Sequence, residues 1–346
     1  MTNINVETKS DYPLVSVLIP TKNRGKEITT MLDSLLKQSY KKIEVIIVDG
    51  YSTDNTIEVV EGYKDKIDIR VFKKKGGLVK QVNCGLKELN GEIFIRTDDD
   101  AEYTKDTIKE IVRTFQLSDD IGGVSGPTIT PDKNTRDLFL FQEKFKKGGL
   151  FWRLVGNFYF NYIFEGKIDK IGEITSSGVA TLGANLPYAL KLKSSVEMVQ
   201  HECITYAVRT DLLRKIGGFD EIFSTVGDYH EIDASFRLRD LGYKIMLNPA
   251  AYAYHHTSKD GVYSARNGSF WRIVNFINFY FRHIKPNTFR KFFHFFAYLF
   301  FQNAYYTYMF IKQRKLVLLG CYFGSIYGIL INFFKVSSWR GGLKTN

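Results

Sequence analysis

Short apolar runs alternate with helix-type patterns through the first hundred residues of the chain. Four runs are rich in β-branched and other apolar residues, as buried strands are: 14–20, 42–50, 67–73 and 92–100. Three intervening segments place apolar residues along one face of a helix: 25–38, 52–64 and 78–91. Repeated strand–helix–strand order with uncharged strands predicts an α/β fold, built on a parallel sheet that helices cover on both faces.

Polar clusters follow three of the predicted strands. They are Thr21 to Arg24 after the first, Asp49 after the second and Asp98 to Asp100 after the fourth. In open α/β sheets, ligands bind where the carboxyl ends of the strands meet the helix N-termini. We therefore expect these clusters to border one binding site.

Three adjacent aspartates, Asp98, Asp99 and Asp100, end the fourth run. Side chains two apart on a strand face the same way, so Asp98 and Asp100 can act as a pair while Asp99 points elsewhere and matters less. Such a pair can hold Mg²⁺ or Mn²⁺ together with substrate phosphates. The alternative is a solvated acidic turn that caps the helix predicted after residue 103.

The second half is less regular. Residues 130–200 include the aromatic-rich segment 151–164 and Ser/Gly-rich stretches, which indicate a variable insertion and mobile loops over a site. Order returns with a strand, a helix and a Gly-Gly turn in 203–221, a helix in 230–245 and a strand in 251–256.

Two long aromatic runs, 292–311 and 316–334, lie near the end of the chain, separated by the basic segment Lys-Gln-Arg-Lys at 312–315. The second run is long enough to span a membrane, but a two-span hairpin would place its basic turn against the positive-inside tendency. Helices lying in the interface on anionic lipid suit the charges better. One transmembrane span and a soluble or oligomer-forming apolar hairpin remain the alternatives.

Lysine and arginine outnumber acids by 48 to 37, for a formal net charge of +11, which favours a polyanionic partner. No RNA- or DNA-binding motif is present, so we expect no nucleic-acid partner. The cysteines Cys84, Cys203 and Cys321 form no CxxC pair, and the polar N-terminal tail 1–13 lacks an export signal. These features fit a reducing, cytoplasmic setting.

Residues 15–56 and 83–100 together resemble the nucleotide-binding half of family 2 glycosyltransferases, which have the GT-A fold. That resemblance implies a site for a nucleotide-sugar and Mn²⁺ or Mg²⁺. Lys22 stands where many members have tyrosine, and Lys80, ahead of the fourth strand, is a further candidate for nucleotide binding. The nucleotide-sugar-binding residues expected on this basis are Pro20, Thr21, Asn23, Arg24, Asp49, Lys80, Asp98 and Asp99, with Asp98 and Asp100 as metal ligands.

The resemblance continues to about residue 285, most closely to the rhamnosyltransferase-like branch. Residues 217–221 are similar to the acceptor-side turn, which assigns Gly218, Phe219 and Asp220 to the acceptor. The helix at 230–245 implies Glu231 as catalytic base, with Asp228 in reserve and His230 where glutamate is usual. Segment 254–270 implies a third metal ligand, His255 or His256, and a diphosphate contact at Arg266.

The expected organisation is a tail (1–13), a GT-A domain (14–285, divided at 128/129 into nucleotide and acceptor halves) and membrane-associated helices (286–346). The chain is expected to be an inverting, metal-dependent glycosyltransferase at the cytoplasmic face of the cell membrane. It would transfer one sugar to a lipid-linked or saccharide acceptor, since the QxxRW signature of processive synthases is absent. A sugar-phosphate nucleotidylyltransferase and a non-catalytic basic binding protein are the alternatives, and the oligomeric state is left open.

Overall fold

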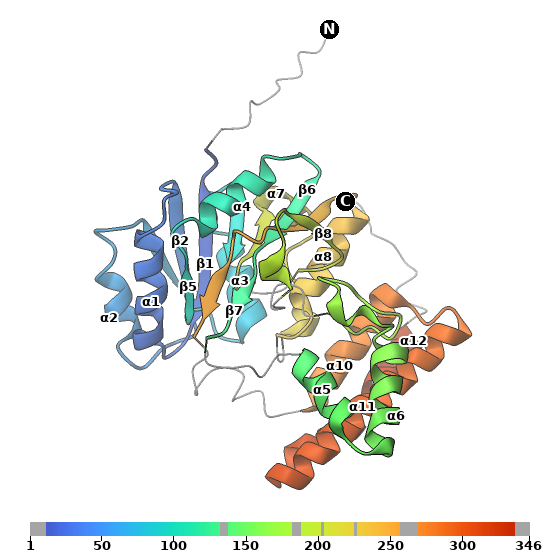
Figure 1. Cartoon of the computed structure of the whole chain (residues 1–346). Coiled ribbons are helices and arrows are strands. Elements are labelled where there is room, and N and C mark those ends of the chain that lie inside the picture. Colours follow the sequence, from blue (N-terminus) through green and yellow to red (C-terminus); the bar gives the residue numbers. More distant parts are fainter. Residues whose placement is uncertain are drawn as a thin grey trace.

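The computed structural model describes residues 12–131, 138–181, 188–201, 204–224, 227–256 and 269–335. Eight strands form one central sheet in the order β3-β2-β1-β4-β9-β6-β10-β8 (Figure 1). They are β1 (Val15–Thr21), β2 (Ile43–Asp49), β3 (Ile69–Lys73), β4 (Ile93–Arg96), β6 (Ile121–Ser125), β8 (Val196–Met198), β9 (Tyr206–Arg209) and β10 (Lys244–Leu247).

The sheet is mixed, which corrects the prediction of a parallel one. Strands β1 to β4 are parallel, as expected, but β9 lies antiparallel between β4 and β6, and β8 is antiparallel to β10. An apolar run indicates a buried strand and gives no direction for it. Strand β9 follows a long insertion instead of a single crossover helix, so the strand–helix alternation of the first half did not apply to it.

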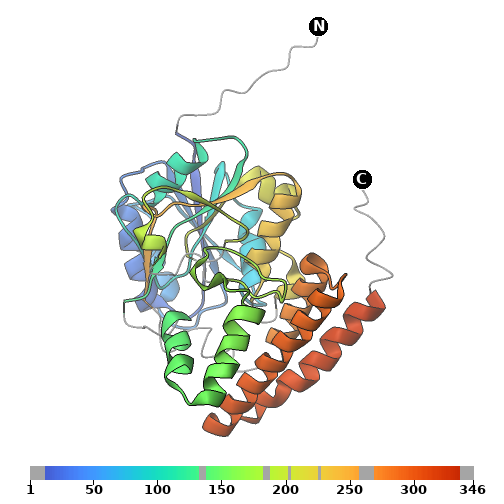
Figure 2. The same ribbon diagram turned by 45° about the vertical axis from the view of Figure 1, so that its right-hand side comes forward.

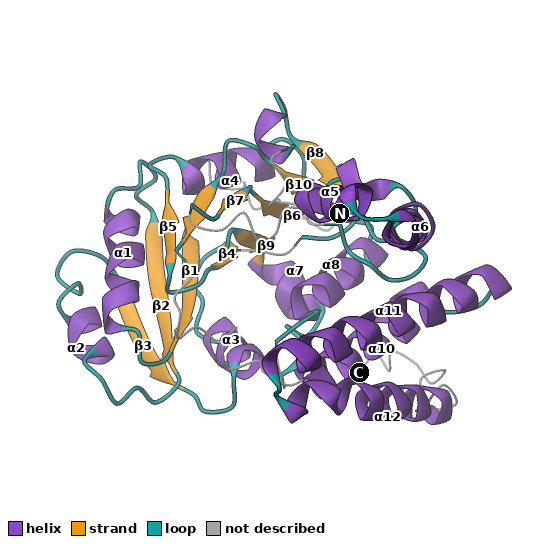
Figure 3. Ribbon diagram, turned by 60° about the horizontal axis from the view of Figure 1, so that its bottom comes forward, coloured by secondary structure: helices purple, strands orange, loops and turns teal. Residues whose placement is uncertain are grey.

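Helices cover both faces of the sheet, as predicted, and Figure 3 shows α1 and α3 on opposite sides of the strands. Alternation along β1 explains this arrangement: Val17 and Ile19 pack with the core under α1 and α4, while Leu18 packs under α3 and α8. The covering helices are α1 (Gly25–Leu36), α2 (Thr56–Glu61), α3 (Leu78–Leu86), α4 (Thr107–Phe115), α7 (Thr210–Lys215) and α8 (His230–Asp240).

A second, smaller sheet has the order β5-β11-β7. Its strands are β5 (Ala101–Tyr103), β7 (Thr128–Ile129) and β11 (Ala253–His255). Strand β5 begins directly after the three aspartates, and its antiparallel register with β11 sets His255 opposite Ala101. This pairing, across about 150 residues of sequence, was not predicted, and it brings a histidine to the aspartates.

A helical body gathers at one end of the molecule (Figures 1 and 2). The aromatic part of the insertion, which had no assigned structure, is helical and belongs to this body. Its elements are α5 (Leu138–Lys147), α6 (Leu150–Asn157), the π-helix η2 (Phe158–Ile163), α10 (Ser269–Phe279), the π-helix η6 (Tyr280–Ile284), α11 (Phe289–Gln313), the short 3₁₀ helix η7 (Leu316–Leu319) and α12 (Gly320–Lys335). Further 3₁₀ turns are η3 (Lys167–Asp169), η4 (Ala189–Lys191) and η5 (Glu221–Phe223).

Helix α12 packs closely along α10 through glycines spaced by four residues. A Cβ at Gly324 would lie 2.5 Å from the carbonyl oxygen of Phe270, and one at Gly328 would lie 2.8 Å from Ile277. The stretch Leu316–Phe334 has the length and composition of a membrane span, with a mean hydropathy of 1.8, and 28% of it is buried within the fold. One face of α12 is therefore used for packing, while most of the helix surface stays apolar and uncovered.

Candidate active site

Asp98, Asp100 and His255 meet where β4 ends and β5 begins. His255 Nε2 lies 3.0 Å from Asp100 Oδ1 and 3.9 Å from Asp98 Oδ2, and one ligand atom from each residue falls within 4.8 Å of the others. Two carboxylates and an imidazole are a suitable donor set for Mn²⁺ or Mg²⁺ completed by phosphate and water. The predicted pairing of Asp98 with Asp100 is present, and the solvated acidic turn does not describe it.

The structure separates the two candidate histidines. His255 is buried beside the aspartates, whereas the exposed ring of His256 faces Glu102, with Nε2 2.7 Å from a carboxylate oxygen. His255 is the last residue of β11 and His256 follows it, and the alternation of an extended chain turns their side chains to opposite faces of the small sheet. His255 is the histidine that this geometry offers to a metal.

Asp99 points away from this cluster, toward the end of β1. The hydroxyl of Thr21 donates to Asp99 Oδ2 at 2.7 Å. Desolvation raises the pKa of Asp99 to about 7, helped by the negative charge of Asp100 and opposed by the hydrogen bond from Thr21. Asp99 thus ties the β4 end to the β1 end, which places two of the predicted nucleotide-side residues in contact.

Arg96 connects the aspartates with the predicted base. Its guanidinium contacts Asp98 Oδ1 through one terminal nitrogen and donates to Glu231 Oε1 through the other at 3.0 Å. Arg96 and Glu231 are both largely buried, at the end of β4 and the first turn of α8. The predicted base therefore lies one side chain away from the predicted metal ligands, and Arg96, which sequence reasoning missed, orients both carboxylates.

The other residues predicted near the base, Asp228 and His230, have structural contacts of their own, and the predicted diphosphate contact cannot be placed. Asp228 Oδ2 lies 3.4 Å from Arg272 Nε on α10, so its carboxylate faces the helical body. His230, where a glutamate is usual, is buried with Nδ1 2.6 Å from the carbonyl oxygen of Gly227. Arg266 lies outside the described residues.

The ends of β1 and β2 are built around a tight set of turn contacts. Both carboxylate oxygens of the buried Asp49 accept a hydrogen bond from the backbone N–H of Ser52. The hydroxyl of Ser52 also donates to Asp49, at 2.6 Å. Ser52 thus supplies two donors to Asp49, and the predicted contact of Asp49 with a nucleotide-sugar stays a prediction. Asn23, with φ of 53°, accepts from the Thr53 backbone N–H at 2.8 Å.

The remaining nucleotide-side candidates lie nearby. Pro20 is buried in β1, Arg24 pairs with Glu27 at 3.3 Å on the first turn of α1, and Lys80 is partly exposed on the first turn of α3. Gln81, which sequence reasoning did not select, donates to the carbonyl oxygens of Thr21 and Val48 and so joins the β1 and β2 ends. These residues occupy one edge of the sheet, as predicted, and their roles toward a nucleotide stay predictions.

The predicted acceptor turn is fixed from several sides. Gly218 has φ of 74° and its carbonyl oxygen accepts from Arg237, while Asn83 donates to and accepts from the backbone of Phe219. Phe219 itself is a core residue, and Asp220 pairs with Arg282 at 2.7 Å. These contacts explain the turn structurally, and they leave contact with an acceptor as a prediction.

Asp233 anchors α8, the helix that carries the predicted base Glu231. Its fully buried carboxylate accepts from Arg237 at 2.8 Å, from Arg282 at 2.7 Å and pairs with His283 at 2.8 Å. Burial raises the pKa of Asp233. The hydrogen bond with His283 and the charges of Arg237 and Arg282 outweigh burial and hold this pKa well below its usual range. Asp233 is thus a buried anion that pairs with Arg237 on its own helix and with two residues of η6 that no sequence spacing indicated.

Comparisons with known proteins point to one family. Residues 16–167 match the model described as glycosyl transferase family 2. The chain is 40% identical over 100 residues to poly(ribitol-phosphate) beta-N-acetylglucosaminyltransferase TarS of Staphylococcus aureus, a match that covers 28% of this chain and 18% of TarS. It is 29% identical over 168 residues to dolichyl N-acetyl-alpha-D-glucosaminyl phosphate 3-beta-D-2,3-diacetamido-2,3-dideoxy-beta-D-glucuronosyltransferase of Methanococcus voltae, covering 45% and 52% of the two chains.

Among solved structures, mannosyltransferase PcManGT from Pyrobaculum calidifontis, in complex with GDP-Man and Mn²⁺, is similar with a TM-score of 0.53. The sequence identity is 17%, and the match covers 93% of this chain and 88% of that one. This similarity confirms the expected GT-A fold. The chain matches about half or less of the length of the two sequence relatives above, so their substrates and acceptors do not transfer to it directly.

Proposed function

We propose that this chain, whose residues 16–167 match the glycosyl transferase family 2 model, is a glycosyltransferase that moves one sugar, with inversion, from a nucleotide-sugar to a membrane-borne saccharide acceptor. The observation that carries this proposal is the meeting of Asp98, Asp100 and His255 with Glu231 through Arg96. It combines a candidate cation site with a carboxylate base at the carboxyl ends of the strands, where ligands of such sheets bind.

Asp98, Asp100 and His255 are the residues that would hold Mn²⁺ or Mg²⁺. Such a cation, when bound, supplies positive charge to the diphosphate of the donor. PcManGT, whose fold this chain shares, is described with GDP-Man and Mn²⁺, which supports a nucleotide-sugar and a divalent cation as ligands. The base and the sugar of the donor are left open.

Glu231 is the proposed general base. It would take the proton of an acceptor hydroxyl as that oxygen attacks the anomeric carbon. The bond between the anomeric carbon and the diphosphate oxygen breaks in the same step, and the nucleoside diphosphate leaves with the electron pair. Arg96 orients Glu231 for this role through one terminal nitrogen of its guanidinium, while the other terminal nitrogen contacts Asp98.

The acceptor side is proposed to include the turn at Gly218 to Asp220, which lies against α8. The apolar helices α11 and α12 would hold the enzyme on the cytoplasmic face of the cell membrane, close to a lipid-linked acceptor. The relatives support this choice in part, since one acts on a poly(ribitol-phosphate) and another on a dolichyl phosphate-linked sugar according to their names.

Thermal-shift measurements with UDP-, GDP- and dTDP-sugars, with and without Mn²⁺, test the donor part of the proposal. A ligand that binds the folded state raises the melting temperature, so one donor class should do so in a Mn²⁺-dependent manner. Asp100→Asn should remove the Mn²⁺ dependence. Glu102→Gln, which alters the neighbouring carboxylate–histidine pair at His256, is the matched control and should keep it. If no donor stabilises the protein with or without Mn²⁺, the proposal is wrong.

Glu231→Gln tests the base. The variant should lose transfer by about a hundredfold or more while keeping the donor-dependent shift. Asp228→Asn is the comparison, because Asp228 is the reserve candidate on the same loop-to-helix segment. Loss of transfer in Asp228→Asn with activity retained in Glu231→Gln would move the base to Asp228.

A further inference from the structure

Positive charge is concentrated at the C-terminal end of the chain. Residues 261–346 contain twelve Lys and Arg and no Asp or Glu, so this stretch alone exceeds the formal net charge of +11 of the whole chain. Residues 1–260, which include the α/β part, carry 36 Lys and Arg against 37 Asp and Glu and are therefore close to neutral. Exposed positive charge on the described helices, such as Lys312, Arg314 and Lys315, attracts a polyanion to the helical body.

The same helices expose an unusual amount of aromatic and aliphatic surface. Phe300 is 69% exposed on α11, and Phe323 and Phe334 are 71% and 77% exposed on α12. Scattered exposed apolar residues need no explanation, but a continuous series along two helices marks a binding surface. Other members of this series are Phe293, Phe296, Tyr305, Tyr308, Ile311, Tyr322, Ile326, Tyr327, Leu330 and Phe333.

The α5–α6 hairpin, more than 130 residues earlier in the sequence, also combines positive charge with exposed apolar side chains. Leu150, Phe151, Trp152 and Leu154 are 72%, 66%, 54% and 60% exposed at the start of α6. The exposed residues Lys144, Lys146 and Lys147 precede them, and Arg153 lies among them. The turn from α11 to α12 has the same order: exposed Lys312, Arg314 and Lys315, then Leu316 at 75% exposure and Val317 at 49%.

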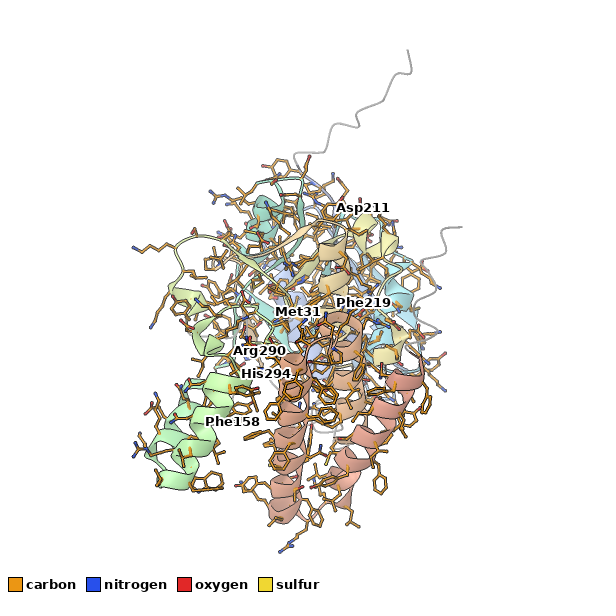
Figure 4. The ribbon with its side chains drawn as sticks, turned by 90° about the vertical axis from the view of Figure 1, so that its right-hand side faces the viewer. Met31, Phe158, Asp211, Phe219, Arg290 and His294 are labelled. Atoms are coloured by element: carbon orange, nitrogen blue, oxygen red, sulfur yellow. The ribbon has the colours of Figure 1, made fainter. Side chains whose placement is uncertain are left out.

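Aromatic contacts join the two hairpins into one body. The ring of Phe158, where α6 continues into η2, stacks on Phe301 of α11 with centroids 6.0 Å apart. The ring centroid of Tyr162 lies 5.9 Å from that of Phe293 and 4.0 Å from that of His294. Figure 4 shows Phe158 on the α6–η2 helix beside the α11–α12 pair, with all of these helices extending from the same end of the α/β part.

We propose that the α5–α6 hairpin is a second membrane-binding element, which inserts Leu150, Phe151 and Trp152 into an anionic bilayer beside α11 and α12. This inference rests on the membrane attachment in the proposed function and extends it to a segment of the insertion. Aromatic side chains interleaved with lysine and arginine suit the interface of a bilayer with anionic headgroups. A protein partner would need acidic and apolar groups matched to two separate hairpin turns, whereas a lipid surface supplies both along its whole extent.

Two attachment points also fix the orientation of the enzyme. A single helix on a bilayer leaves rotation about its axis free, while two hairpins from one rigid body define a plane. Strand β11, which ends at His255, points toward the end of the molecule where the hairpins lie (Figure 1). The candidate site would then open toward the membrane surface, where a lipid-linked acceptor is presented.

Vesicle co-sedimentation of the full chain tests this inference. The vesicles contain phosphatidylcholine alone or phosphatidylcholine with about one third phosphatidylglycerol, at low and high salt. We expect binding to the anionic vesicles that weakens with salt. The double variant Phe151→Ser/Trp152→Ser should bind about a hundredfold more weakly, because two large apolar side chains are lost and each is worth about a tenfold step in partitioning. Leu117→Ser removes a residue of similar exposure, 65%, from the turn after α4 and should bind as the wild type does.

A tryptophan reporter makes the test independent of folding effects. The chain has three tryptophans, so Trp271→Phe/Trp339→Phe leaves Trp152 as the fluorophore. Brominated lipid in anionic vesicles should quench Trp152 strongly, and an unquenched Trp152 in vesicle-bound protein would overturn the inference. Each variant should keep the donor-dependent thermal shift of the wild type, which shows that it is folded.

The outcomes distinguish the two proposals. If the wild type binds no vesicles but shows the donor shift, the membrane attachment as a whole is wrong while the transferase proposal stands. If it binds vesicles and loses this binding in Phe323→Ser/Ile326→Ser but not in Phe151→Ser/Trp152→Ser, the α5–α6 hairpin is no membrane element. A dimer in solution that dissociates in the Phe151→Ser/Trp152→Ser variant would show that a second copy covers this face, and would also overturn the inference.

Discussion

His201 makes the stability of the fold depend on pH in a direction that can be measured. The ring is buried, with Nδ1 2.8 Å from the hydroxyl of Ser235 on α8, and it stacks on Tyr206 with centroids 3.9 Å apart. Desolvation lowers the pKa of His201 to about 3, against the opposing effect of its contact with the carbonyl oxygen of Ala207. In the unfolded chain the pKa returns to about 6.5.

The difference in pKa sets the size of the effect. Above about pH 6.5 the imidazole is neutral in both states and adds no pH dependence. Between about pH 6.5 and pH 3 the unfolded chain binds a proton that the folded chain does not, so the free energy of unfolding falls by about 1.4 kcal/mol per pH unit. At about pH 5 this loss amounts to about 2 kcal/mol.

His201→Gln isolates this contribution, because glutamine stays neutral at every pH. Urea unfolding of the wild type and the variant, followed by tryptophan fluorescence at about pH 7.5 and about pH 5, gives the free energy of unfolding of each. The wild type should lose about 2 kcal/mol more than the variant over this interval, since the other five histidines cancel in the comparison. A difference between the two proteins that does not change with pH would refute the assignment of a neutral, buried imidazole.

Three further substitutions probe the contacts that hold the site and the helical body. Arg96→Met should destabilise the protein by about 3 kcal/mol, because two carboxylates lose their shared cation. Added Mn²⁺ should then raise the melting temperature more in this variant than in the wild type, and equal shifts would contradict the bridging role. Asp233→Asn should cost about 3 kcal/mol or more in urea unfolding, since two arginines and a histidine ring lose their buried anion; a loss below about 1 kcal/mol would show that they find other partners. Gly324→Ala should lower the melting temperature because its Cβ meets the Phe270 carbonyl oxygen, whereas Gly149→Ala, with no atom within 4 Å, should not, and equal effects would contradict the close packing of α12.

Most of the first half of the fold followed from periodicity. The runs at 14–20 and 42–50 became β1 and β2 within one residue at either end, since alternating burial on two helical layers requires continuous apolar strands. The same reasoning failed at β9. Its residues have the pattern of a buried strand, but its direction depends on where the preceding insertion leaves the chain, which no local pattern records.

The site was predictable as far as it depends on strand ends. Asp98 and Asp100 share a direction because of the period of a strand, and that period is visible in the sequence. The choice of His255 over His256 depends on the register of β11 against β5, a long-range pairing that only the folded chain defines. Arg96 was hidden for a related reason: an arginine inside an apolar run gives no sign that its partners are Asp98 and a glutamate 135 residues away.

Helix α10 and η6 connect the proposed membrane helices α11 and α12 to α8, which carries the proposed base, and this connection determines which experiments can separate their roles. On one side α10 packs against the glycines of α12, and on the other Arg282 and His283 of η6 hold Asp233 on the base helix. A chain that ends near residue 288 would therefore expose the apolar face of α10 and weaken the support of α8 at the same time. Loss of activity after such a truncation would not distinguish membrane attachment from positioning of Glu231. Substitutions on the outward faces of α6 and α12, which leave the α10 contacts in place, should affect the proposed membrane-binding surface alone.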